Sequence, residues 1–132
     1  MDRVRVAVGT CILLWCAGAI AQSGAFSPEQ AKRGEALFLD KCAACHGNKL
    51  EGGQEAPPLR GDTFWSEWDQ KTARALYGRI ISTMPPDTPG SLAEKEVIDI
   101  VAFVAHENGL PLGTRTIGSA DELNNIKLQR PK

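Results

Sequence analysis

The stretch CAACH, residues 42–46, brings three of the scarcest residues of this 132-residue chain into little more than one helical turn. The chain holds four cysteines and two histidines. Cys11 and Cys16 lie in an apolar N-terminal segment, so Cys42 and Cys45 are the two cysteines that remain beyond it. Two cysteines three positions apart, with a histidine directly after the second, indicate a site with one dedicated chemistry.

The N-terminal segment has the pattern of a secretory signal peptide. Two arginines precede an apolar run over residues 6–21, which ends in a small-x-small cleavage motif. We predict a signal peptide over residues 1–21, cleaved near Ala21, and a periplasmic mature protein. A retained membrane anchor is less favoured, because the run is shorter than the roughly 20 residues that a span requires. Lipid attachment at Cys16 is disfavoured by the bulky Trp15, where lipoprotein signals have a small residue.

The rest of the chain suits one small domain, which we place at residues 22–118, followed by a tail over residues 119–132. The formal net charge is −1 and no basic stripe is present, which argues against nucleic-acid binding. The apolar fraction of 42% permits a compact core, although a core this small often needs an additional staple.

The first element after the signal segment is predicted to be a helix over residues 28–40. Ser27 can cap it, and Gln30 is placed to complete a capping box. Glu29 and Arg33 are four residues apart, which favours an ion pair on the exposed face of this helix.

Later helices are indicated by apolar spacing and by stop signals. A capping box starting at Ser91 precedes the strongest helical stripe, which Gly109 ends. A weaker pattern predicts a helix over residues 72–82, after a glycine- and proline-rich loop over residues 48–62. Ser119 starts a short helix in the tail. No strand alternation is evident, so the sequence predicts an all-α chain with long loops. The stripe consists of Val97, Ile100, Val101 and Val104.

Four interpretations of CAACH compete. Export favours a disulfide between the two cysteines. A thioredoxin-like redox pair is the second, but that motif belongs in a βαβ setting that this sequence lacks. A zinc site is the third, and it would need a remote fourth ligand such as His106. The fourth is covalent haem, because Cys-x-x-Cys-His is the attachment pattern of c-type haem.

Covalent haem explains the spacing best. The thiols of Cys42 and Cys45 can each bond one vinyl-derived carbon of a porphyrin, and the adjoining His46 then lies under the iron as its proximal ligand. The macrocycle would also supply buried apolar surface that so short a chain lacks. One covalently bound haem c is therefore the predicted cofactor.

The sixth position of the iron decides between electron transfer and catalysis. Met84 is the only methionine beyond the signal segment, and it precedes two prolines that restrict the backbone. The alternative for Met84 is a core-filling role. His106 lies near the exposed end of the last predicted helix, where a solvated side chain is expected. We therefore favour His46 and Met84 as the two iron ligands, as in many electron-transfer haem proteins.

From about residue 27 to residue 111 the sequence resembles the class I c-type cytochromes. The resemblance rests on the first helix with Gly34, the CAACHG turn, and the Met84 loop before a final helix with Phe103. It implies a cytochrome c fold of three to five helices with long loops around one haem. It also implies that the first and last helices cross where Gly34 meets an aromatic residue, and that Pro57 offers its carbonyl to the His46 ring.

Further roles follow from the same resemblance. Arg60, Trp65 and Trp68 are candidate donors to the haem propionates, with a surface arginine and core tryptophans as the alternative. The segment around Met84 also looks like the cytochromes that serve quinoprotein alcohol dehydrogenases. We therefore expect a periplasmic electron-transfer protein, not an enzyme, that carries single electrons between a dehydrogenase and a respiratory acceptor such as a terminal oxidase or another cytochrome. Contact with a membrane is expected only through partners. A haem enzyme or gas sensor with an open sixth site is the alternative.

Overall fold

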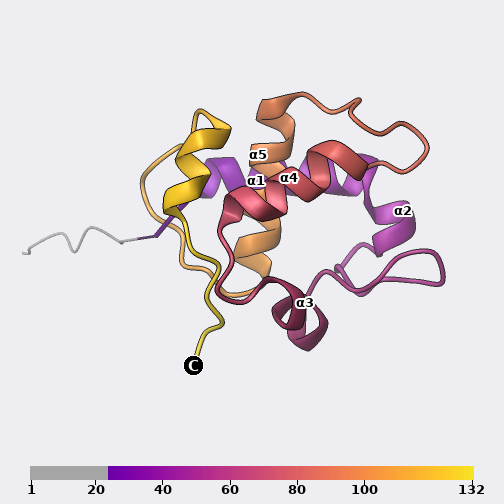
Figure 1. Ribbon diagram of the computed structural model, residues 1–132, viewed down its shortest axis with the longest axis horizontal. Coiled ribbons are helices and arrows are strands. Elements are labelled where there is room, and N and C mark those ends of the chain that lie inside the picture. The colour runs from indigo at the N-terminus through magenta and orange to yellow at the C-terminus, as the bar shows by residue number, and fades with distance from the viewer. Residues whose placement is uncertain (1–23) are drawn as a thin grey trace, which may run out of the picture.

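The structure is a computed structural model that describes residues 24–132; the predicted signal peptide lies outside the described residues. Within that range the chain is helical, with two isolated β-bridges and no strand, which confirms the all-α class. Between residues 24 and 132, no helix combines the length and apolar character needed to cross a membrane. The elements in order are α1 (Pro28–Lys41), α2 (Ala43–His46), α3 (Gly61–Trp68), α4 (Ala73–Thr83), α5 (Glu94–Glu107) and the 3₁₀ helix η1 (Ala120–Asn125) (Figure 1).

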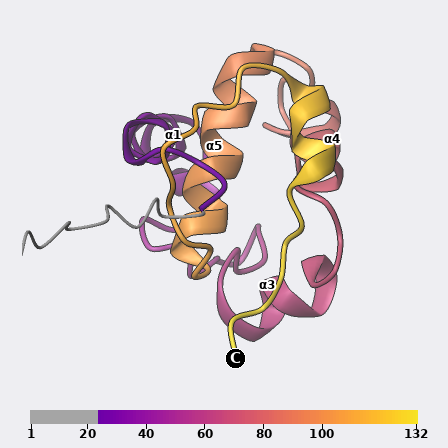
Figure 2. The ribbon, with the colours of Figure 1, turned by 90° about the vertical axis from the view of Figure 1, so that its left-hand side faces the viewer.

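Helices α1 and α5 cross at the centre of the molecule (Figures 1 and 2). A Cβ atom on Gly34 would overlap the Asp99 carbonyl oxygen and lie 2.9 Å from the Phe103 Cβ. The Phe38 and Phe103 rings pack beside this contact with their centroids 5.4 Å apart. The glycine therefore permits the close approach of the two helices, as the sequence predicted.

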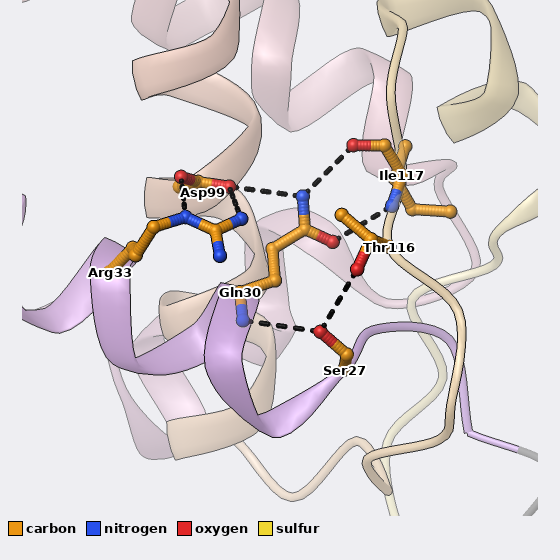
Figure 3. A network of polar contacts seen from close by, with 6 residues as sticks. All are labelled: Ser27, Gln30, Arg33, Asp99, Thr116 and Ile117. Carbon is orange, nitrogen blue, oxygen red and sulfur yellow. Dashed lines mark hydrogen bonds and ion pairs between the residues drawn. The ribbon is translucent and has the colours of Figure 1, made fainter.

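The start of α1 confirms one half of the predicted capping box and corrects the other. The Ser27 hydroxyl accepts from the Gln30 amide N–H at 3.2 Å. The Gln30 side chain does not return to the cap. It is fully buried, donates to Asp99 Oδ1 and the Ile117 carbonyl, each at 3.0 Å, and accepts from the Ile117 N–H at 2.9 Å (Figure 3).

The predicted Glu29–Arg33 ion pair is also replaced. Arg33 Nε donates to Asp99 Oδ2 at 2.8 Å, and its Nη2 donates to Oδ1 at 3.1 Å. Asp99 is buried on α5, and a buried carboxylate needs paired donors, so it outcompetes the exposed Glu29 for the guanidinium (Figure 3).

Helix α5 begins three residues later than the predicted cap at Ser91. Ala93 is the last extended residue, and the Glu96 carboxylate accepts from its N–H at 2.9 Å. The Ser91 hydroxyl bonds Thr88 Oγ1 at 3.2 Å instead. Leu92 between them is buried, which holds this stretch extended until the helix starts.

Helix α3 falls at the end of the predicted loop and in a stretch where no helix was predicted. Its buried residues Phe64, Trp65 and Trp68 have helical spacing, but the side chain of its own N-cap residue, Arg60, makes no capping hydrogen bond. The Gly61 N–H instead donates to Asn108 Oδ1 at 3.0 Å, far along the chain. A cap supplied from α5 leaves no signal in the local sequence.

The C-terminal tail packs against the rest of the domain. Leu123 and Leu128 are fully buried and belong to the same hydrophobic core as α4 and α5. The Ala73 N–H donates to the Ile126 carbonyl, and the Gln70 N–H donates to the Leu128 carbonyl, both at 2.8 Å. In Figure 2 the tail runs down along α4 toward α3. The short helix predicted after Ser119 is observed as η1.

Candidate functional site

The CAACH turn lies directly after α1 and forms α2. Cys42 ends α1 by donating its N–H to the Phe38 carbonyl at 2.8 Å, and its own carbonyl accepts from the His46 N–H at 3.0 Å. Cys45 is one turn further along and exposed, whereas Cys42 is half-buried. Both thiols are free. The turn therefore presents two thiols and one imidazole from a single helical segment.

The pKa of the Cys42 thiol bears on the redox interpretation of the motif. Burial raises the pKa of the Cys42 thiol to about 11, and the nearby Lys41 ammonium opposes this only partly. Reactive redox pairs depend on a cysteine whose pKa is lowered, which is the opposite shift. In residues 24–132 no group of three or more histidine, cysteine or acidic side chains is arranged to hold a metal ion. The direction of the Cys42 shift is therefore not the one that a thioredoxin-like pair needs.

The His46 ring is buried and oriented by one hydrogen bond. Its Nδ1 lies 3.0 Å from the Pro57 carbonyl oxygen. A carbonyl can only accept, so Nδ1 carries the proton and Nε2 keeps a lone pair for a metal. The contact falls on Pro57, the residue that the resemblance implied, and not on the adjacent Pro58.

The loop that carries Pro57 is tied to its surroundings along its length. The Gly52 N–H donates to the His46 carbonyl at 2.7 Å, and the Leu59 N–H donates to the Leu50 carbonyl at 2.9 Å. Asn108, at the end of α5, donates to the Leu59 carbonyl at 2.9 Å. Sequence analysis did not single out Asn108. Its only sequence signal is a polar residue between a strongly apolar helix and the glycine that stops it.

Met84 lies at the C-terminal cap of α4, where its N–H donates to the Ile80 carbonyl at 2.9 Å. The side chain is half-buried, and most of the residues that follow it are exposed. The end of α4 and helix α2 lie toward the same end of the long axis of the molecule (Figure 1). Ligation by Met84 stays a prediction.

The predicted propionate donors occupy two different environments. Arg60 is exposed and donates to the Lys49 carbonyl at 3.2 Å. Trp65 packs edge-on against the Phe64 ring with the centroids 5.0 Å apart, and the Lys71 ammonium lies 5.1 Å above the Trp68 ring.

Both tryptophans are buried in the core. Their role toward propionates stays a prediction. His106 is exposed on α5, as predicted from its position near the helix end.

Comparison with known proteins identifies the family. The model of the family described as cytochrome c oxidase, cbb3-type, subunit III matches residues 29–104, more than half of the chain. The chain belongs to this family. The match spans α1, the CAACH turn and nearly all of α5, so the fold and the motif lie inside it. The protein is therefore a class I c-type cytochrome, and its cofactor is covalently bound haem c.

Two known proteins are similar to this cytochrome. The cbb3-type cytochrome c oxidase subunit CcoP of Rubrivivax gelatinosus is 27% identical over 92 residues, which are 69% of this chain and 30% of that subunit. The chain thus spans less than a third of its curated relative. The solved sulfane dehydrogenase SoxCD of Paracoccus pantotrophus is 22% identical with a TM-score of 0.54, covering 93% of this chain and 68% of that one. The second likeness shows a shared fold.

The residues present fit such a cofactor. Two free thiols one turn apart suit two thioether bonds, and the tautomer of His46 set by Pro57 leaves Nε2 available for iron. Haem c supplies a one-electron couple at its iron. Cys42 and Cys45 would provide the attachment points, and the Pro57 carbonyl would orient the imidazole.

Proposed function

We propose that this cytochrome is a periplasmic electron carrier that passes single electrons between a dehydrogenase and a respiratory acceptor. Cys42 and Cys45 hold the haem, and His46 and Met84 ligate its iron. The observation that carries the proposal is the His46–Pro57 hydrogen bond, which fixes a buried imidazole with Nε2 left for a metal. The two relatives belong to an oxidase and a dehydrogenase, and both names support a redox partner.

The arrangement of these residues suits electron transfer. An imidazole held by a carbonyl and anchored beside two attachment points moves little when the charge at the metal changes. A soft thioether on the other side favours the reduced iron and keeps small molecules away from it.

The first test concerns covalent attachment. The parent and the variants Cys42→Ala and Cys45→Ala are produced in an exporting host and assayed by pyridine haemochrome spectra. We expect a c-type spectrum for the parent and little or unstable holoprotein for each variant, because one thioether is lost. Normal yields of haem-loaded single variants would contradict the assignment of both cysteines.

The second test separates a carrier from an enzyme or gas sensor with an open iron. Met84→Ala should abolish the weak red-edge absorption band of sulfur-bound ferric haem, open the iron to carbon monoxide and lower the reduction potential. His106→Ala is the control and should change none of these, because that side chain is exposed. Rapid binding of carbon monoxide by the reduced parent would favour the open-site alternative.

A further inference from the structure

We infer that Asn108 is a positioning residue for the haem ligand His46, because it holds the segment that brings the Pro57 carbonyl to the imidazole Nδ1. The inference rests on the proposed role of His46 as an iron ligand. It concerns a residue of α5's C-terminal cap that lies outside the family match at residues 29–104.

The Asn108 side chain is buried and uses its amide fully. Its Nδ2 donates to the Leu59 and Val104 carbonyls, each at 2.9 Å, and its Oδ1 accepts from the Gly61 N–H at 3.0 Å. The bond to Val104 lies within the end of α5 and suffices as a helix cap. The bonds to Leu59 and Gly61 reach a segment more than forty positions away, and a cap has no need of them.

The segment held by Asn108 is stiff up to Pro57. Leu59 is two residues beyond Pro57, and Pro58 between them has its φ angle fixed by its ring. The Leu59 N–H also donates to the Leu50 carbonyl at 2.9 Å, so both the N–H and the C=O of Leu59 are hydrogen-bonded. Few rotations remain between the held Leu59 carbonyl and the Pro57 carbonyl. A displacement of Leu59 therefore moves the acceptor away from His46.

Loss of that acceptor has a predictable sign. A carbonyl bonded to the imidazole N–H makes the ring a stronger electron donor, which favours the oxidised form of a metal on Nε2. Weakening the bond disfavours the oxidised form, so the reduction potential should rise. The same change should expose the Nδ1 proton to exchange with solvent.

The test compares three variants of the full-length holoprotein. Asn108→Ala removes all three bonds. Asn108→Leu also removes all three bonds but keeps the approximate size of the side chain without adding a charge, and it serves if the alanine variant fails to fold. Gln30→Ala is the matched control, because it also removes a buried amide with three long-range hydrogen bonds, one to Asp99 on α5 and two to Ile117. All three variants should unfold more easily than the parent.

The potential and the proton distinguish positioning from stability. We expect both Asn108 variants to raise the reduction potential and to accelerate exchange of the His46 Nδ1 proton in the reduced protein by about tenfold, the order expected for one lost hydrogen bond. Gln30→Ala should leave both unchanged. Equal shifts in Gln30→Ala, or unchanged values in the Asn108 variants, would overturn the inference. Failure of the proposed function is recognised separately, because the parent itself would then lack the spectrum of histidine-ligated haem c.

Discussion

Each of the two proposed iron ligands is followed by a segment without regular structure. The loop after His46 and the segment after Met84 are held in different ways. The first is bonded to His46, to Leu50 and to Asn108 of α5. The second contains mainly local bonds, from the Thr88 N–H to the Pro85 carbonyl and from the Ser91 N–H to the Thr88 carbonyl. None of residues 85–91 is buried. The histidine side is therefore fixed by polar contacts, and the methionine side depends on the packing that flanks it.

This difference predicts a functional division between the loop after His46 and the segment after Met84. Changes in the rigid loop after His46 should act on the reduction potential, through the imidazole. Changes in the exposed segment after Met84 should act on access to the iron, because that segment can move without breaking contacts elsewhere. Helix α5 joins the two, since it begins after the Met84 segment and ends at Asn108.

The largest expected effect is loss of the fold, which would disrupt both ligand segments together. Gly34→Leu would force a side chain into the Asp99 backbone at the α1–α5 crossing. Overpacking typically costs about 1–3 kcal/mol, and a clash with backbone cannot be relieved by a rotamer change, so we expect little folded holoprotein. Thermal unfolding and haem content measure the outcome.

Gly78→Ala is the matched control for this change. A Cβ on Gly78 in α4 would meet only Arg74 Nη1, at 3.6 Å, and alanine in a helix is favoured by about 1 kcal/mol. It should melt at or above the parent temperature. A Gly34→Leu protein that melts within a degree or two of the parent would place the crossing elsewhere.

The next effect separates the two sides with a pair of equal truncations. Leu92 is buried after the Met84 segment, and Leu50 is buried in the His46 loop. Each change to alanine should destabilise the fold by about 2–5 kcal/mol. Leu92→Ala alone should speed carbon monoxide binding to the reduced protein, and Leu50→Ala alone should shift the potential. Chemical denaturation, stopped-flow binding and redox titration report these outcomes, and identical profiles for both variants would remove the proposed division.

The smallest expected effect is measured on the parent protein, without a mutation. The amides of Gly52 and Leu59 are hydrogen-bonded, whereas those of Asp87 and Gly90 make no hydrogen bond within the part of the chain that the structure describes. In native-state amide exchange we expect the first pair to be slower by on the order of a hundredfold, because their opening requires their bonds to the His46 and Leu50 carbonyls to break. Similar rates in both segments would show that the methionine side is held as firmly as the histidine side.

Local patterns in the sequence predicted the all-α class and the cap at Ser27, and both depend on residues close in sequence. The α1–α5 crossing and the contact between His46 and Pro57 were implied by the resemblance to the class I c-type cytochromes. The attachment roles of Cys42 and Cys45 and the ligand role of Met84 stay predictions that the experiments above address.

Apart from the start of α5, the features that sequence analysis missed depend on partners distant in the chain. Gln30 and Arg33 had suitable local partners, but the buried Asp99 on α5 binds both. The Gly61 N–H at the start of helix α3 donates to Asn108, and no local pattern reveals this bond. A single sequence shows which residues can make such bonds, whereas only the folded chain shows which of the competing partners becomes buried.

The bond between Gln30 and Ile117 also bears on the order in which the molecule is assembled. It joins positions 87 residues apart, so the first helix cannot satisfy its buried amide until most of the chain has been synthesised. Contacts this distant slow folding, because the intervening loop must close before packing rewards it. The first helix consequently completes its contacts only once residue 117 is in place, and until then Cys42 and Cys45, the proposed attachment points, lie in an open chain.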